Sequence, residues 1–201
     1  TITIINHCPK RITLGKVTNG QTHDPHVWLE TGASTNYAFD GSWSGRFYGY
    51  DHCEPDSCPM AGAASPASLA EFTFGTTDYY DVSFVDGYNL PLQILPVEPN
   101  MAMDQAINNN YWCRTASCAS VPACPEALLQ TDGSSGCKSA CSQFGNPEYC
   151  CAGSFSTLAT CPINAYAQRI KDACPDVYSY AYDDQTSLFQ CVASAYTVTF
   201  C

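Results

Sequence analysis

The fold is decided by one stretch of the sequence, which reads Asp78-Tyr79-Tyr80-Asp81-Val82-Ser83-Phe84-Val85-Asp86-Gly87-Tyr88-Asn89-Leu90-Pro91. In its first half the polar Asp81 and Ser83 alternate with apolar neighbours, as they do in a strand that has one face on a core. Asp86-Gly87 then separates this run from a second one, residues 88–94, and Asp-Gly in that position predicts a β-hairpin. The stretch therefore predicts two paired strands joined by a tight turn.

Alternation of the same kind extends from this stretch towards both ends of the chain. Residues 1–5, 11–17, 69–74 and 196–200 all alternate between apolar and polar side chains. In the third of these segments Glu71 lies on the face opposite Phe72, so its carboxylate is expected to point away from the core. Many short strands separated by Gly- and Pro-rich turns predict a mainly-β protein with a β-sandwich core.

Fourteen cysteines are distributed unevenly over the 201 residues, and eleven of them lie from Cys113 onwards. An even count at this density predicts seven disulfides, an oxidising compartment and hence a secreted protein, outside the cell or in a cell wall. Metal binding is the alternative, because pairs such as Cys137 and Cys141 resemble metal ligands. The spacings do not repeat as they do in zinc sites, however, and the adjacent Cys150-Cys151 favours disulfides. We therefore expect no metal and no other cofactor.

Between the cysteines of the second half, the pattern becomes partly helical. Residues 134–145 resemble a short helix, with serines at the start and Gly145 after the end. Residues 162–173 form a better one, in which Pro162 fits the first turn and Ile163, Tyr166 and Ile170 share a face. The sequence thus predicts a disulfide-rich lobe with two short helices beside the sandwich.

Charge excludes several classes of function. Eight basic and nineteen acidic residues give a formal net charge of −11. A chain of this sign is not attracted to the phosphates of nucleic acids or to an anionic membrane surface. No apolar run approaches the ~20 residues that span a bilayer. We expect a monomer that neither binds nucleic acid nor inserts into a membrane, and from which any signal peptide has been removed.

Motifs along the whole chain identify a family resemblance. Gly45-Arg46-Phe47-Tyr48-Gly49, Leu69-Ala70-Glu71-Phe72, the stretch from Asp78 to Pro91, Glu148-Tyr149-Cys150-Cys151, Cys174-Pro175-Asp176-Val177-Tyr178-Ser179-Tyr180 and the terminal Tyr196-Thr197-Val198-Thr199-Phe200-Cys201 resemble conserved segments of the thaumatin-like proteins, in the same order. The fold that this resemblance implies is a β-sandwich flanked by a disulfide-rich helical lobe, with a cleft between them. Here the sandwich would comprise residues 1–50, 66–112 and 175–201, and the lobe 113–174.

The resemblance also implies a disulfide connectivity that spacing alone leaves open. The expected pairs are Cys8–Cys201, Cys113–Cys191, Cys118–Cys174, Cys124–Cys137, Cys141–Cys150 and Cys151–Cys161. Cys53 and Cys58 remain and would close a small disulfide loop, residues 51–65. Larger members of the family have sixteen cysteines and two bridges in that region, so this loop domain is expected to be reduced.

Acidic residues of the same motifs are the candidate site. In the family an Arg-Glu-Asp-Asp-Asp set forms an acidic cleft, and the resemblance places its acids at Glu71, Asp81, Asp86 and Asp183. The arginine is missing, because Ala64 occupies its position, so the cleft is expected to be more acidic. A solvated acidic surface is the ordinary alternative for such carboxylates.

The resemblance links such a cleft to β-1,3-glucan, and two carboxyl groups suffice for glycoside hydrolysis. We predict that Glu71 is the general acid, that Asp86 is the base or nucleophile, and that Asp81 and Asp183 tune the charge. The candidates for stacking on sugar rings are Tyr79, Tyr80, Tyr88 and Tyr182. The predicted function is an endo-β-1,3-glucanase acting on fungal-type cell-wall glucan. The alternative is an antifungal defence or wall-associated lectin-like protein that binds glucan without turnover.

Overall fold

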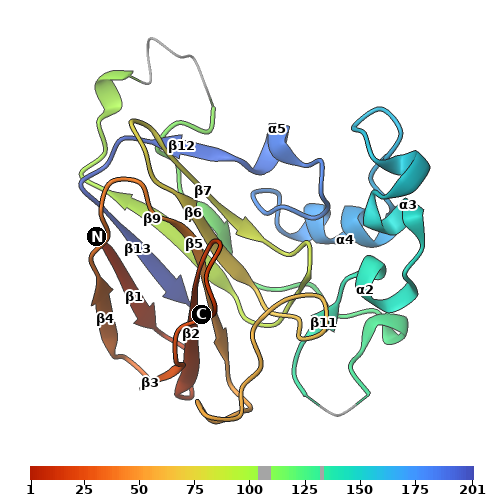
Figure 1. Ribbon diagram of the computed structural model, residues 1–201, viewed down its shortest axis with the longest axis horizontal. Helices are drawn as coiled ribbons and strands as arrows, with labels where there is room; N and C mark the ends of the chain where they lie inside the picture. Colours follow the sequence, from red (N-terminus) through yellow and green to blue (C-terminus); the bar gives the residue numbers. More distant parts are fainter. Residues whose placement is uncertain (104–109, 132–133) are drawn as a thin grey trace.

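The computed structural model describes residues 1–103, 110–131 and 134–201, so the parts of the predicted sandwich and lobe at 104–109 and 132–133 lie outside the described residues. Two sheets make the sandwich (Figure 1). The five-stranded sheet has the order β10 (Ala116–Cys118), β9 (Leu92–Val97), β13 (Ala195–Phe200), β1 (Ile2–Asn6) and β4 (Ser34–Tyr37). The six-stranded sheet has the order β12 (Phe189–Cys191), β7 (Asp78–Ser83), β6 (Leu69–Thr73), β5 (Ser44–Tyr50), β2 (Ile12–Thr18) and β3 (Val27–Leu29). The predicted mainly-β fold is confirmed.

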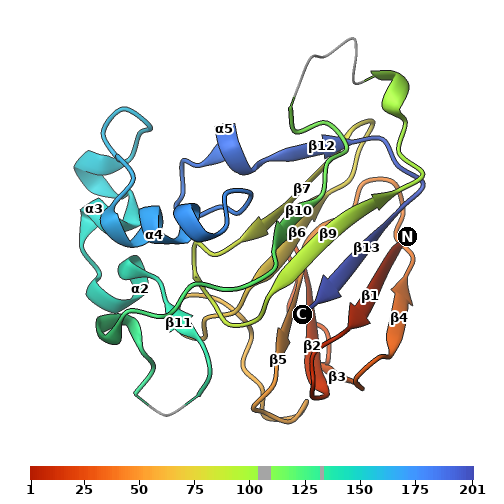
Figure 2. The same ribbon diagram turned by 180° about the vertical axis from the view of Figure 1, so that it is seen from behind.

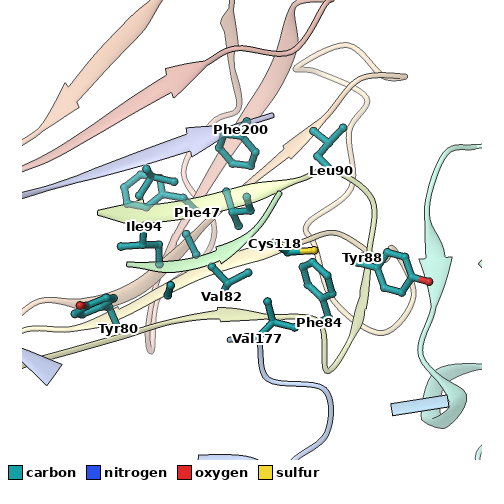
Figure 3. Close-up of a cluster of buried hydrophobic side chains, with 14 of the residues drawn as sticks. Phe47, Tyr80, Val82, Phe84, Tyr88, Leu90, Ile94, Cys118, Val177 and Phe200 are labelled. Carbon is teal, nitrogen blue, oxygen red and sulfur yellow. The ribbon is translucent and has the colours of Figure 1, made fainter. Parts of the chain in front are cut away.

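The core lies between the two sheets. Strand β13 buries Tyr196, Val198 and Phe200 on one face, as their alternation predicts. Figure 3 shows Phe200 above Phe47 and Ile94 in the space between the sheets, and all three are fully buried. Strands β1 and β13 run parallel side by side although they come from opposite ends of the chain. The Cys8–Cys201 disulfide holds these two ends together, 193 residues apart in the sequence.

The hairpin predicted at Asp86-Gly87 is wrong, although the turn itself exists. Gly87 N–H donates to the carbonyl of Phe84 at 3.0 Å, which closes a tight turn. Beyond it, the chain leaves the six-stranded sheet: β8 (Gly87–Tyr88) pairs with β11 (Cys137–Lys138), and β9 joins the five-stranded sheet. Gly87 has a φ of +107°, and a Cβ there would lie 2.3 Å from the carbonyl oxygen of Cys137. The turn therefore forms a corner at which the chain passes from one sheet to the other, and the lobe packs against its outer side.

The lobe contains the helices α2 (Ala140–Phe144), α3 (Pro147–Cys150) and α4 (Ala165–Ala173), with 3₁₀ turns η2 (Glu126–Leu128) and η3 (Gly153–Phe155). A further short helix, α5 (Asp184–Ser187), precedes β12, and the 3₁₀ turn η1 (Met101–Met103) follows β9. Figures 1 and 2 both show α2, α3 and α4 together on the side of the sandwich opposite β1 and β4. The seven disulfides have the connectivity that the resemblance implied.

Both predicted helices are shorter than expected at their start. In the first, residues 137–138 pair as strand β11 instead, and Ser139 accepts from the N–H of Ser142 as the N-cap. In the second, Pro162 lies before the helix rather than in its first turn. The N-cap is Asn164, whose side chain accepts from the N–H groups of Tyr166 and Ala167. Side-chain capping thus sets both helix starts.

The small loop 51–65, closed by Cys53–Cys58, covers part of the outer face of the six-stranded sheet. Beneath it lies a second, smaller core, in which Tyr48 and Tyr50 of β5 pack with Ala61 and Leu69. One end of this outer face is therefore closed by the loop, and the end at β6 and β7 is left for polar side chains.

We predict that Gly87→Ala lowers the free energy of unfolding by about 3 kcal/mol, because it combines a strained positive φ with overlap against Cys137 and Pro66. Urea unfolding with the disulfides intact measures the change. Gly41→Ala is the matched control, since nothing lies within 4 Å of its added Cβ. Equal stability of the two variants would contradict the role of Gly87 at this corner.

Candidate functional site

Three charged side chains form a row across the outer face of the six-stranded sheet. Glu71 on β6 lies directly opposite Arg46 on β5 and directly opposite Asp81 on β7. Opposed residues on neighbouring antiparallel strands have Cβ atoms about 4.5–5.5 Å apart, so these side chains are in each other's immediate field. The structure therefore brings Glu71 and Asp81 together as the sequence predicts.

Burial and like charge keep protons on this pair of carboxyl groups. Burial raises the pKa of Glu71, and the charge of Asp86 adds to the effect, while Arg46 and a hydrogen bond with Ser83 act in the opposite direction. The pKa of Asp81 lies well above its usual range, first because of burial and then because of the charges of Glu71 and Asp184. Ionisation of one of these carboxyl groups makes ionisation of the other less favourable. One of them therefore stays protonated at a pH where an ordinary carboxyl is ionised.

Arg46 corrects the expectation that the site lacks a cation. Its Nη2 donates to the carbonyl of Ala61 in the small loop at 3.2 Å, which holds the guanidinium beside Glu71. Ala64 does stand where the family has arginine, but a cation reaches Glu71 from β5 instead. Among the described residues, Arg46 Nε and Asp81 Oδ1 are buried without a hydrogen-bond partner. They belong to the two residues that lie opposite Glu71 on the neighbouring strands, so both sides of Glu71 have a polar atom with unused hydrogen-bonding capacity.

Asp183 is not in this row, and the position predicted for it in the cleft is wrong. Only 6% of the residue is exposed. Its Oδ2 accepts from the N–H and the hydroxyl of Ser179 at 2.9 Å and lies 3.2 Å from Lys171 Nζ, and its Oδ1 accepts from Thr186 at 2.6 Å. Asp183 thus anchors α5 to α4. The neighbouring Asp184 acts on Asp81 instead.

Asp184 and Tyr178 complete the surroundings of Asp81. The hydroxyl of Tyr178 donates to Asp184 Oδ1 at 2.9 Å. The backbone of Tyr178 forms an isolated parallel β-bridge with Ser83, the last residue of β7. Burial raises the pKa of the Tyr178 hydroxyl, and its hydrogen bond to Asp184 and the charge of Asp81 raise it further, so the group remains a neutral donor. The motif that contains Tyr178 is visible in the sequence, but its place beside Asp81 depends on this long-range pairing.

The tyrosines predicted to bind sugar divide into two groups. Tyr80 and Tyr88 are buried in the core, where their rings pack on Phe189 and Phe84, so they are wrong as sugar-stacking residues (Figure 3). Tyr79 is 39% exposed and lies two residues from Asp81 on the same face of β7. It remains a candidate, and so does Tyr182, which is half-buried.

A cleft of about 170 Å³ separates the corner at Phe84–Asp86 from the lobe. Asp86 lines its sandwich side, so the cleft begins at the carboxylate whose charge acts on Glu71. The lobe side is lined by Ser139 and Tyr149 and by Asn164 and Tyr166 at the start of α4, and Tyr180, which follows the lobe in the chain, also lines the cleft. Our sequence-based list contains none of these lobe residues, because their motifs carry no sign of which face points to the cleft.

Further structural findings limit the chemistry. In residues 1–103, 110–131 and 134–201, no three His, Cys, Asp or Glu side chains are grouped as a metal site requires. None of the helices described is long and apolar enough to cross a membrane.

Comparisons with known proteins agree with the motifs. The family model described as "Thaumatin family" matches residues 6–201. A pathogenesis-related thaumatin-like protein 3.5 from Cryptomeria japonica is 39% identical over 99% of this chain and 88% of its own length, and thaumatin-like protein 1 from Pyrus pyrifolia is 39% identical over 99% and 89%. A protein from Prunus avium named glucan endo-1,3-beta-glucosidase is 36% identical over 100% of this chain and 90% of its own length.

We predict that Lys171→Met lowers the free energy of unfolding by about 3–5 kcal/mol, because it leaves the buried Asp183 without its cation. Adding Asp183→Asn to this variant is expected to recover part of the loss. Urea unfolding at neutral pH measures both, with the exposed Lys10→Met as control. A negligible effect of Lys171→Met would mean that Asp183 is solvated and available to the cleft.

We predict that Asp81→Asn stabilises the protein at pH 7 by on the order of 1–2 kcal/mol. The pKa of Asp81 is higher in the folded than in the unfolded state, so the unmodified protein loses stability as the pH rises from the unfolded pKa towards the folded one. Near pH 3, where this carboxyl is protonated in both states, the two proteins are expected to be equally stable. Urea unfolding at both pH values tests this, with the exposed Asp56→Asn correcting for net charge; stabilisation at pH 3 as well would contradict the stated cause.

Proposed function

Because the chain belongs to the thaumatin family, we propose that it is a secreted protein that recognises β-1,3-glucan and hydrolyses it as an endo-β-1,3-glucanase. The observation that carries this proposal is the pair of opposed carboxyl groups of Glu71 and Asp81, which retain a proton, together with Asp86, which lines the cleft and whose charge acts on Glu71. A retained proton and a second carboxylate are what glycoside hydrolysis requires.

Glu71 is the general acid in this proposal. It gives its proton to the glycosidic oxygen while the bond from that oxygen to C1 breaks, and burial together with the charge of Asp86 keeps this proton on Glu71. Asp86, at the corner, either takes a proton from the water molecule that attacks C1 or attacks C1 itself; in the second case a water molecule then displaces the Asp86 carboxylate from C1 and gives its proton to Glu71. The two routes differ in stereochemical outcome, which the separation of the two carboxyl groups determines.

Charge supports a neutral polysaccharide as the substrate. A net charge of −11 repels anionic polymers, whereas an uncharged glucan chain experiences no such repulsion. The oxocarbenium-like transition state is positive, so the surrounding carboxylates stabilise it more than they stabilise the ground state. Seven disulfides suit an extracellular site of action, since bonds of this kind persist in oxidising compartments.

A relative with a named activity supports the same substrate class. The protein from Prunus avium carries the name glucan endo-1,3-beta-glucosidase and aligns with this chain from end to end. The two other relatives are named only as thaumatin-like proteins, so the glucanase activity of this chain rests on its own site.

Binding without turnover is the second candidate, and the position of Asp183 favours it. The structure withdraws this acid from the cleft and uses it to hold α5, which leaves fewer carboxylates to stabilise a positive transition state. In this alternative the protein is a glucan-binding antifungal or wall-associated protein that uses the same cleft.

We predict that the protein releases reducing ends from laminarin and that Glu71→Gln lowers kcat about 10²- to 10⁴-fold while laminarin binding is retained, because the amide cannot donate the proton. The activity is expected to persist to a higher pH than an ordinary Glu allows, since the raised pKa keeps the acid protonated. A reducing-end assay over a pH series measures both effects.

Glu30→Gln, an exposed substitution of the same kind, is the control and is expected to leave kcat unchanged. Binding of laminarin by the unmodified protein without any release of sugar would favour the lectin-like alternative. Release that survives Glu71→Gln would remove Glu71 from the role of general acid.

A further inference from the structure

Three aromatic rings pack together on the lobe, at the edge of the cleft. The ring centroid of Phe144 lies 5.6 Å from that of Tyr149 and 5.7 Å from that of Tyr166, and the two tyrosine rings are 6.0 Å apart. Tyr149 and Tyr166 also line the cleft, and so does Tyr180. These three tyrosines are half-buried, in contrast to Tyr80 and Tyr88 in the core.

We propose that Tyr149, Tyr166 and Tyr180 form a binding surface for neutral sugar rings, which holds the part of the polysaccharide chain that extends from the acidic residues across the lobe. This proposal rests on the proposed function, because it assigns binding residues to the rest of the same polysaccharide chain. It assigns binding to residues that lie apart from the charged row of the sheet and that are not among the site residues predicted from the sequence.

The side chains that line the cleft match a sugar better than they match an anion or a purely apolar ligand. Aromatic faces bind the C–H faces of pyranose rings, and neighbouring polar groups bind the hydroxyls. Such groups are present: Ser139 and Ser179 line the cleft, and so does Asn164, whose described hydrogen bonds use only Oδ1 and leave the Nδ2 group to donate.

The charges that line the cleft favour an uncharged ligand over an anion. Lys138 is the one cation among the residues that line this cleft, and its Nζ is engaged by Gln143 Oε1 at 3.2 Å. Asp86 lies on the opposite wall, and the whole chain is strongly negative. The one cation and the one carboxylate of the lining offset each other, so the cleft has no excess of positive charge to hold a phosphate or a carboxylate, whereas an uncharged polysaccharide needs none.

Disulfides make the surface rigid before any ligand arrives. Cys141–Cys150 joins α2 to α3, and Cys151–Cys161 ties the end of α3 to the segment that leads into α4. Phe144, Tyr149 and Tyr166 are carried by these three helices, and Phe144 packs on both tyrosines. Rings that are already in place lose little conformational freedom on binding, which favours affinity for a weakly interacting ligand such as a sugar.

The test is calorimetric titration with laminarihexaose of the unmodified protein and of Tyr149→Leu and Tyr166→Leu, which keep apolar bulk but remove the aromatic face. Each is expected to weaken binding about five- to tenfold. Tyr166→Phe is expected to bind as the unmodified protein does, since stacking needs the ring rather than the hydroxyl. Trp28→Leu, an exposed aromatic on β3 at the far edge of the sheet, is the matched control and is expected to have no effect.

Each result separates this proposal from the proposed function. Unchanged affinity of both leucine variants overturns the tyrosine surface and leaves the acidic site untouched. Weakened binding in a protein that releases no reducing ends supports the surface and overturns hydrolysis, whereas failure of the unmodified protein to bind laminarihexaose overturns both. If a leucine variant does not fold, the ring NMR signals of Tyr149 and Tyr166 in the unmodified protein decide: a shift on titration supports the surface, and no shift overturns it.

Discussion

The register between β6 and β7 is the constraint on which the candidate site depends. With Glu71 opposite Asp81, two carboxyl groups face outwards side by side, while Phe72 and Tyr80 of the same strands enter the core. Side chains alternate with a period of two, so a slip of one residue would turn the acids into the apolar interior and expose the aromatic rings. The large cost of that exchange holds the register, and the register holds the two carboxyl groups together. The packing of the core thus supplies the energy that keeps the carboxyl pair in place.

The second constraint is covalent. The lobe is small and built from short helices, and regions of this kind bury too little apolar surface to be stable without cross-links. Its disulfides join α2 to α3 and α3 to the segment before α4, while Cys118–Cys174 ties the lobe to β10. A rigid lobe wall follows, and the corner at Asp86-Gly87 brings the sandwich up to it. The cleft is therefore the space between a wall held by packing and a wall held by covalent bonds.

Charged side chains on the sandwich and on α5 act on the carboxyl groups of the candidate site. On the sandwich side Arg46, held by Ala61, partly offsets the carboxylates, so that Glu71 is poised between a cation on β5 and acids on β7 and at the corner. On the side of α5, Asp183 is neutralised by Lys171, while Asp184 keeps its influence on Asp81. Two adjacent aspartates thus have different roles: Asp183 stabilises the packing of α5, and Asp184 raises the pKa of Asp81.

The sequence by itself determined the fold class, the strands that carry Glu71 and Asp81, the disulfide-dependent lobe and the candidacy of Glu71, Asp81 and Asp86, because alternation, cysteine count and motifs are local or family-wide signals. Only the tertiary structure decided that Asp86-Gly87 turns a corner rather than a hairpin, since a tight turn does not specify which strand its exit will pair with. It likewise decided that Arg46 accompanies Glu71, that Asp183 is withdrawn, and that Tyr80 and Tyr88 are buried. Each of these depends on partners far away in the chain, and a residue's burial and charge environment are properties of those partners rather than of its own neighbours in sequence.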